Sequence, residues 1–389
     1  YELPTLELRT EDGESYTPAE NVTAGGSAAE SAQIAAQSAF NTEMSNVLAG
    51  LRSEASQMAA EGKELYETTG SAGFTGGSCW VNELSVTSTY MTEEGLLSVV
   101  AENYTYYGGA HPNSVSRTWS FDLTTGEFLT LDALSSEEGN INGDSLQTSI
   151  YQNIVSQIDS QGLSEAYFDD YDSYLSDFPA FATFYFTATG MTVAFDTYII
   201  APYAAGPQVF DVPYSVFYSA LNERAKTLLE VPQEQIVLSD FDTAATLWSW
   251  LFITTPPTEN TPDEVEINGY TYYQADIQGV STMAELRALM YRYFDKALAD
   301  RWLEETERYA EADGRLYVLS ADRGSNDSIM DETCSVALDG ESGTVTQTVT
   351  YGEWDEATQS WAATGEETFA YPFTLVDGHA VFSAFPYPY

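Results

Sequence analysis

The hydrophobic pattern near the start of the chain predicts a long helix. Ser27 and Glu30 have the spacing of a capping box, in which a hydroxyl and a carboxylate satisfy each other's backbone donors. Apolar residues then recur every three or four positions as far as about Gly62, which places them in one stripe along a helix. The members of this stripe are Phe40, Met44, Val47, Leu51, Ala55 and Met58.

Strand-like patterns follow this helix. Two runs between Val81 and Tyr106 are separated by turn residues at 93–95, and the alternation over 115–121 predicts a half-buried strand. Further elements are expected as far as Leu229. They are a helix over 145–177, a hairpin of 181–187 with 191–199 around Gly190, a strand over 209–212 and a helix over 215–229.

A second set of elements begins after about residue 230. An apolar run over 247–253 stops before a Pro-Pro pair, and Thr282 and Glu285 have capping-box spacing ahead of another helical stripe. Short β-rich runs then predict an antiparallel sheet, at 316–319, 334–338, 345–351 and 369–375. Because each half runs helix first and sheet later, we predict an α+β fold with two α+β domains, each with helices packed on an antiparallel sheet.

The distribution of charge supports this division. Residues 118–223 hold fifteen acids and no base, whereas seven of the thirteen bases fall between Arg287 and Arg323. A length of 389 residues also exceeds what one hydrophobic core usually supports. We expect an acidic linker over 1–26, of the kind that holds a domain away from a membrane anchor, and domains over 27–230 and 238–389.

The net charge excludes several classes of partner. Sixty acids against thirteen bases give a formal charge of −47, which argues against nucleic acid and against anionic membrane surfaces. The chain has no run of about 18 apolar residues, so no membrane span is expected within it. The 27 tyrosines and a hydrophobic content of 43% argue against disorder of the whole chain.

The sequence contains few groups that indicate catalysis. The two cysteines, Cys79 and Cys334, form no Cys-x-x-Cys motif, so they are either one disulfide of an exported protein or two buried thiols. His111 and His379 are the only histidines, and neither accompanies a Gly-x-Ser-x-Gly or His-Glu-x-x-His motif. Pairs of carboxylates are too numerous to single one out. We predict no catalytic residue, no metal and no cofactor.

Two aromatic, glycine- and proline-rich segments stand out, at 106–112 and 198–207. Exposed aromatic residues on rigid loops are typical of protein- and glycan-binding surfaces, although turns with packed tyrosines would have the same composition. The candidate partner-binding residues are Tyr107, Gly108, Gly109, His111, Pro112, Tyr198, Pro202 and Tyr203.

These segments carry a family resemblance. The motifs are Tyr-Tyr-Gly-Gly-Ala-His-Pro-Asn at 106–113, Trp-Ser-Phe-Asp-Leu-Thr-Thr-Gly-Glu at 119–127 and Ile-Ala-Pro-Tyr-Ala-Ala-Gly-Pro at 200–207. Together they resemble the paired extracellular domains of the anti-sigma factor RsiV and the peptidoglycan deacetylase PdaC, over about 28–228. In RsiV this region binds lysozyme, and in PdaC it accompanies a separate catalytic domain, which this chain does not show.

The second half resembles IseA, a secreted inhibitor of cell-wall DL-endopeptidases, over about 238–389. The similar segments are 267–273, 281–286 and 291–297. Both resemblances imply a bacterial protein that is extracellular or anchored at the cell surface and is not an enzyme. Its expected partner is a cell-wall hydrolase, lysozyme or a DL-endopeptidase, which it would sense or inhibit. The alternatives are a peptidoglycan-binding accessory module and a glycan hydrolase with an unrecognised carboxylate pair.

Overall fold

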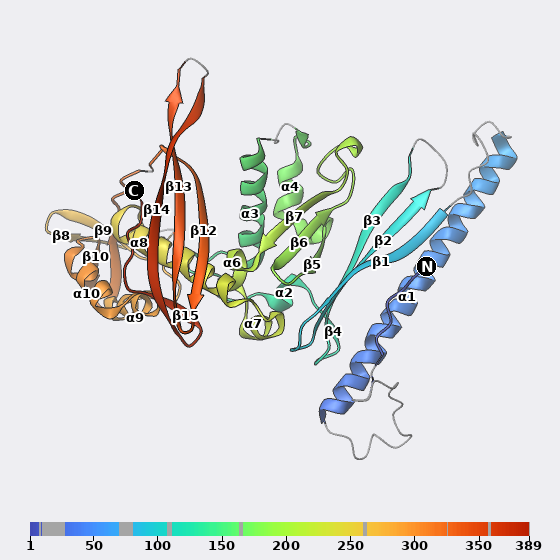
Figure 1. Cartoon of the computed structure of the whole chain (residues 1–389), viewed down its shortest axis with the longest axis horizontal. Helices are drawn as coiled ribbons and strands as arrows, with labels where there is room; N and C mark the ends of the chain where they lie inside the picture. The colour runs from blue at the N-terminus through green and yellow to red at the C-terminus, as the bar shows by residue number, and fades with distance from the viewer. Residues whose placement is uncertain are drawn as a thin grey trace. The chain divides into compact units, whose positions relative to one another are not determined.

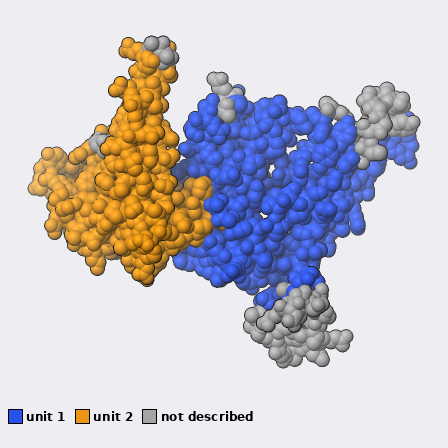
Figure 2. Space-filling model, in the orientation of Figure 1, with its two compact units in different colours: residues 1–135, 147–212, 222–230 blue, residues 136–146, 213–221, 231–389 orange. Residues whose placement is uncertain are grey.

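The computed structural model describes residues 1–7, 9, 28–69, 81–106, 111–162, 166–259, 263–324, 326–356 and 359–388. Its helices and antiparallel sheets confirm the predicted α+β fold. The chain forms two compact units (Figure 2). Unit 1 comprises Tyr1–Ser135, Gln147–Val212 and Asn222–Glu230, and unit 2 comprises Ser136–Leu146, Pro213–Leu221 and Val231–Tyr389.

Two short segments of the predicted domain 27–230 belong to unit 2, namely 136–146 and 213–221. In the second segment, helix α6 (Tyr214–Phe217) packs against α8 (Gln233–Phe252). The backbone N–H of Ser215 donates to Oε1 of Gln235 at 3.1 Å. Residues 222–230, which belong to unit 1, separate this segment from Val231, so a division based on sequence order assigns it to the first domain.

Helix α1 (Ala28–Thr69) is the first helix of unit 1. Phe40, Met44 and Leu51 are buried, which confirms that the apolar stripe is the packed face. The helix continues past Gly62 because one helical glycine costs only about 1 kcal/mol and good helix formers follow it. Ser27 lies outside the described residues, so its capping box stays a prediction.

An antiparallel sheet packs on α1 (Figure 1). Its strands, in order, are β1 (Val81–Met91), β2 (Leu96–Tyr106), β3 (Asn113–Asp122) and β4 (Glu127–Phe128). The rings of Phe40 and Phe121 meet edge to face with centroids 5.4 Å apart, and Leu97 and Val99 belong to the same core. Burial of these side chains holds the helix on the sheet.

The first seven residues also pack on unit 1, although the sequence suggests that they belong to an acidic linker over 1–26. The N–H of Glu2 donates to the carbonyl of Leu84 at 2.8 Å. The side-chain amide of Asn41 bonds both the N–H and the carbonyl of Leu6, each at 2.9 Å. Leu3 and Leu6 contact the core, and burial of these apolar side chains favours the docked position.

The rest of unit 1 contains a three-stranded sheet in the order β5-β6-β7 and several short helices. These elements are α2 (Leu131–Leu134), α3 (Leu146–Gln161), α4 (Tyr171–Ser176), α5 (Phe178–Phe181), β5 (Thr183–Phe186), β6 (Gly190–Phe195), the 3₁₀ helix η4 (Tyr203–Ala205), β7 (Gln208–Pro213) and α7 (Glu223–Leu229).

Both helices predicted here as continuous, at 145–177 and 215–229, are broken. Gly162 follows α3 with a φ of +62°, a left-handed conformation that ends a helix at little cost in glycine. In the second case α6 is followed by the 3₁₀ helix η5 (Tyr218–Ala220), and Asn222 then adopts extended backbone. Oδ1 of Asn222 accepts from the N–H of Ala225 at 2.9 Å, which starts α7 as a separate helix.

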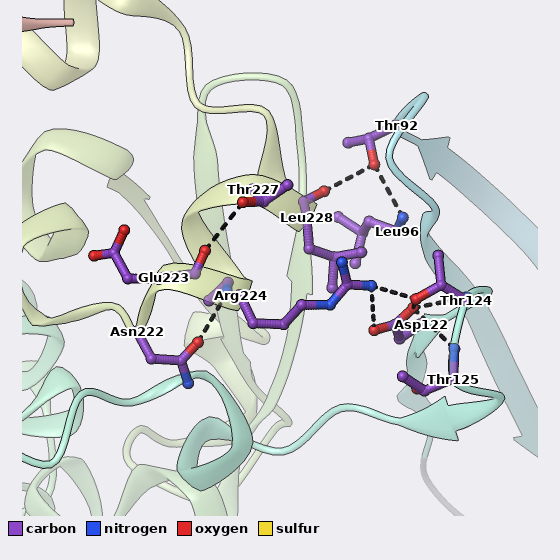
Figure 3. Close-up of polar contacts among 11 residues, drawn as sticks. Thr92, Leu96, Asp122, Thr124, Thr125, Asn222, Glu223, Arg224, Thr227 and Leu228 are labelled. Carbon is purple, nitrogen blue, oxygen red and sulfur yellow. Dashed lines mark hydrogen bonds and ion pairs between the residues drawn. The ribbon is translucent and has the colours of Figure 1, made fainter. Parts of the chain in front are cut away.

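Helix α7 is tied to the β1–β4 sheet by polar contacts (Figure 3). The carboxylate of Asp122 accepts from the guanidinium of Arg224 at 2.7 Å and from the N–H and hydroxyl of Thr124 at 2.8 and 2.6 Å. The hydroxyl of Thr92 donates to the carbonyl of Leu228 at 2.8 Å. These bonds hold α7 against the end of the sheet.

Unit 2 has two four-stranded sheets, in the orders β10-β11-β9-β8 and β12-β13-β14-β15. Its remaining elements are β8 (Glu264–Ile267), β9 (Tyr270–Gln274), α9 (Met283–Tyr293), α10 (Lys296–Glu305), β10 (Tyr309–Ala312), β11 (Arg315–Leu319), β12 (Ile329–Asp339), β13 (Ser342–Asp355), β14 (Ser360–Val376) and β15 (His379–Phe382).

Helix α8 supplies much of the core of unit 2. Its buried residues Phe241, Leu247 and Trp250 belong to one cluster with Phe294 and Tyr371. The predicted apolar run over 247–253 is therefore the end of this helix. No helix of the described residues is long and apolar enough to span a membrane.

The predicted capping box at the start of α9 is confirmed. Oγ1 of Thr282 accepts from the N–H of Glu285 at 3.2 Å, and the Glu285 carboxylate accepts from the N–H of Ser281 at 2.8 Å. The hydrogen bonds that the carboxylate accepts from the N–H of Ser281 and from the Thr282 hydroxyl hold the pKa of Glu285 below its ordinary value. The local spacing was sufficient to locate this helix start because the partners are near neighbours in the chain.

Candidate functional site

The two segments singled out in the sequence meet on unit 1. His111 and Pro112 directly precede β3, whereas Tyr198 and Pro202 lie between β6 and η4 and Tyr203 begins η4. The other candidates, Tyr107, Gly108 and Gly109, lie outside the described residues. We call the five described residues His111, Pro112, Tyr198, Pro202 and Tyr203 the aromatic patch.

The rings of the aromatic patch contact one another directly. His111 and Tyr203 are stacked, with ring centroids 3.7 Å apart and an angle of 23° between the planes. Tyr198 lies beside both, 6.2 Å from the His111 centroid and 5.6 Å from that of Tyr203. Its hydroxyl oxygen is 3.4 Å from Nε2 of His111. Three rings from two separate loops therefore form one cluster.

Hydrogen bonds join the two loops beneath these rings. The hydroxyl of Tyr203 donates to the carbonyl of Pro112 at 3.0 Å, and Nδ1 of His111 lies 3.1 Å from the same oxygen. Nε2 of Gln208 donates to the carbonyls of Ala205 and Gly206, both at 3.1 Å. These bonds hold the loop after η4 in place, so the loop loses less conformational entropy when a partner binds.

Asp196 connects the two strands that carry these loops. Its Oδ1 accepts from the N–H of Ser116 at 2.9 Å. Burial raises the pKa of Asp196 above its ordinary value, although this hydrogen bond and the charge of Arg117 oppose the shift. Asp196 was not among the residues predicted from the sequence, and its position at the end of an apolar strand was the only signal for it.

The patch is open to solvent. The side chains of His111, Tyr198 and Pro202 are exposed, those of Pro112 and Tyr203 are half-buried, and the exposed fraction of Tyr198 is 56%. A rigid, exposed group of aromatic rings can stack on a sugar or fill an apolar depression of a protein. Among the described residues, His111 contacts Tyr198, Tyr203 and Pro112, and these contacts do not form a nucleophile–base pair.

Tyr198 has a strained backbone, with a φ of +70°. The left-handed region costs a residue with a Cβ about 1–2 kcal/mol, and glycine avoids this cost. We therefore expect Tyr198→Gly to be more stable than Tyr198→Ala by about 1 kcal/mol, measured by urea denaturation of both variants. An unstrained site would show the opposite order, because glycine loses more backbone entropy on folding.

The remaining candidate groups that the structure describes form no second site. Cys79 lies outside the described residues, so its pairing with Cys334 is not tested. Cys334 is exposed, so it is not the buried thiol of the second alternative. Partial desolvation of the thiol and the negative charges of Asp242 and Glu332 raise the pKa of Cys334 to about 11, which keeps the thiol protonated at neutral pH. Within the described ranges, no group of three or more His, Cys, Asp or Glu side chains could hold a metal ion.

Two family models match the chain. The model described as deacetylase PdaC matches residues 27–114, and the model described as a protein of unknown function, DUF3298, matches residues 141–215. The PdaC and DUF3298 domains at these positions match the predicted RsiV/PdaC-type pair, and they fit an exported cell-envelope protein. His111 and Pro112 lie in the PdaC match and Tyr198 to Tyr203 in the DUF3298 match, so the aromatic patch contains residues from both.

Two solved structures are similar to parts of the chain. A DUF3298 family member from Bacteroides fragilis is 21% identical, with a TM-score of 0.33, over 48% of this chain and 70% of that one. A DUF3298 family protein from Pseudomonas aeruginosa is 17% identical, with a TM-score of 0.28, over 38% of this chain and 64% of that one. No curated protein matches the chain. The similarity of 238–389 to IseA is not shown and stays a prediction.

Proposed function

We propose that this protein is a non-enzymatic component of the cell envelope that binds a peptidoglycan-degrading enzyme through the aromatic patch. The observation that carries the proposal is the stacked cluster of His111, Tyr198 and Tyr203, which joins exposed loops from both family matches. Rigid exposed aromatic residues are the side chains most often found at the energetic centre of protein interfaces.

The charge of the chain supports the same class of partner. A formal charge of −47 attracts a cationic protein such as lysozyme over long distances and accelerates its association. Attraction of this kind is screened by salt, because the Debye length is only about 10 Å at 0.1 M ionic strength. Binding that survives high salt must therefore come from a shaped interface.

The proposal is tested by interferometry of the immobilised protein against lysozyme and against a DL-endopeptidase, at roughly 50 and 300 mM salt. We expect binding that persists at the higher salt concentration. The double variant Tyr198→Ala/Tyr203→Ala should bind at least about tenfold more weakly, because truncation of a central aromatic residue costs about 2 kcal/mol or more. A matched control is Tyr270→Ala, since Tyr270 is 58% exposed and lies on β9 of unit 2.

Each outcome bears on the proposal. Equal loss of affinity in Tyr270→Ala and in the double variant would show that the aromatic patch is not the contact surface. Binding that disappears at 300 mM salt would leave only charge attraction. Binding of the wild-type chain to purified peptidoglycan, with no affinity for either enzyme, would instead favour a glycan-binding accessory module. A turnover assay on the bound enzyme separates an inhibitor from a sensor, which binds without reducing activity.

A further inference from the structure

Strands β13 and β14 extend beyond their neighbour β12. Their pairing runs from Ser342↔Thr374 to Asp355↔Ser360, whereas the pairing of β12 with β13 ends at Ile329↔Tyr351. The residues beyond that point form a two-stranded projection of unit 2 (Figure 1). We call the described residues 352–356 and 359–364 the finger.

One face of the finger carries two exposed tryptophans. Trp354 and Trp361 are directly paired across the strands, so their side chains lie on the same face. Their ring centroids are 6.1 Å apart with an angle of 75° between the planes, which is an edge-to-face contact. Their exposed fractions are 52% and 44%, and no other tryptophan in the described ranges is exposed.

Met330 extends this apolar face. The pairing passes from Ile329↔Tyr351 to Asp331↔Thr350, so Met330 is the extra residue of a β-bulge. A Cβ added to Gly352 would lie 2.1 Å from the sulfur of Met330, so the missing side chain of the glycine leaves room for the methionine. Side chains at 352 and 354 point to the same face of a strand, and Met330 itself is 43% exposed. Met330, Trp354 and Trp361 thus form one exposed apolar strip.

The strip does not contribute to the hydrophobic core of unit 2. That core contains the other end of the same sheet, through Val345, Tyr371 and Phe373, and includes none of the three strip residues. Large apolar side chains that remain exposed together on a paired hairpin are typical of interaction sites. The two tryptophans are also the residue type most enriched at interface hot spots.

The charges around the strip identify the class of partner. Glu353, Glu356, Glu366 and Glu367 are exposed on or beside the finger, and no lysine or arginine follows Arg323 in the chain. A second copy of this chain, with the same formal charge of −47, would be repelled, as would an anionic membrane. An apolar strip within an acidic surface complements an apolar cleft with a basic rim.

We infer that the finger is a docking element that places Trp354 and Trp361 in an apolar cleft of a cationic protein. The identity of that protein as a peptidoglycan-degrading enzyme rests on the proposed function. Unit 2 then contributes a contact of its own, carried by residues that neither family match includes.

The test uses the full chain and the double variant Trp354→Val/Trp361→Val. Valine retains the strand propensity of these positions while it removes both rings. We expect binding to lysozyme or to the DL-endopeptidase at 300 mM salt to fall at least about tenfold, with an unchanged far-UV circular dichroism spectrum. Trp354→Phe/Trp361→Phe should recover part of the affinity. Equal binding by the wild-type chain and the valine variant would overturn the inference while the proposed function stands.

A second measurement keeps the two proposals separable. The difference in acrylamide quenching between the wild-type chain and the valine variant isolates Trp354 and Trp361 from the other five tryptophans. A short peptide of alternating lysine and leucine serves as a cationic, apolar probe. Protection of the two tryptophans by this peptide, without binding of either hydrolase, would support docking by the finger and contradict the proposed function. Absence of protection by the hydrolases and by the peptide would overturn the inference.

Discussion

Replacing Asp122 with alanine is expected to lower the free energy of unfolding of unit 1 by about 2–3 kcal/mol. The side chain of Asp122 is only 4% exposed and accepts hydrogen bonds from Thr124 and Arg224 (Figure 3). It also accepts from the N–H of Thr125 at 3.3 Å. Its removal leaves these donors without their partner and loosens α7 from the sheet.

The measurement is chemical denaturation followed by circular dichroism. Asp169→Ala is the matched control, because Asp169 is exposed and should change the free energy of unfolding by less than about 0.5 kcal/mol. Similar losses in the two variants would contradict the structural role of Asp122.

The same carboxylate predicts a dependence on pH. Burial alone would raise the pKa of Asp122, but hydrogen bonds from Thr124 and Arg224 outweigh it and hold the pKa below its ordinary value. A lowered pKa in the folded state stabilises the protein above the unfolded pKa, about 3.9, and this contribution is lost as the pH falls through the folded value. The wild-type chain and Asp122→Asn should therefore differ in stability at neutral pH and converge in acid.

Replacing Asp240 with alanine is expected to lower the free energy of unfolding of unit 2 by about 2–3 kcal/mol. Asp240 lies on α8 and is 3% exposed. Its Oδ2 accepts from the N–H of Ala380 at 2.7 Å, and its Oδ1 lies 3.0 Å from Nδ1 of His379. Because Ala380 is fully buried, its N–H would have neither this carboxylate nor water as an acceptor in the alanine variant.

Asp263→Ala provides the comparison in the same unit. Asp263 pairs with Arg315 at 2.9 Å, but the side chains are 67% and 55% exposed. Exposed ion pairs contribute about 0–1 kcal/mol, so this variant should unfold close to the wild type in thermal and chemical denaturation. If Asp263→Ala lowered the free energy of unfolding as much as Asp240→Ala, the role of the Asp240 hydrogen bonds in joining α8 to β15 would be contradicted.

Secondary-structure predictions were confirmed where residues close together in the sequence decide the structure. The capping box at Thr282 and Glu285 was confirmed because both hydrogen bonds close within four residues. The stripe of α1 was confirmed because a period of 3.6 residues places its members on one face. The continuous helices expected over 145–177 and 215–229 were wrong. Gly162 in a left-handed conformation follows α3, and extended backbone at Asn222 precedes α7, and apolar periodicity alone shows neither break.

The length of the β13–β14 hairpin was underestimated for a related reason. The runs 345–351 and 369–375 were expected as strands, but the finger between them was not, because apart from Trp354 and Trp361 its side chains are small or polar and show no apolar alternation. Pairing with the opposite strand extends β13 and β14 through this region without a buried face. The strand register then places Trp354 opposite Trp361, and neither strand's sequence alone indicates this register.

The sequence by itself determined the fold class, the acidic character, the RsiV/PdaC-type pair and the two segments that carry the candidate residues. Only the tertiary structure decided that the ring of His111 stacks on Tyr203. It also decided that Tyr198, 87 residues after His111 in the chain, contacts the same histidine ring. It also decided that Met330, Trp354 and Trp361 share one face. Helix starts depend on a few adjacent residues, whereas these clusters depend on strand register and on burial of a core assembled from the whole unit.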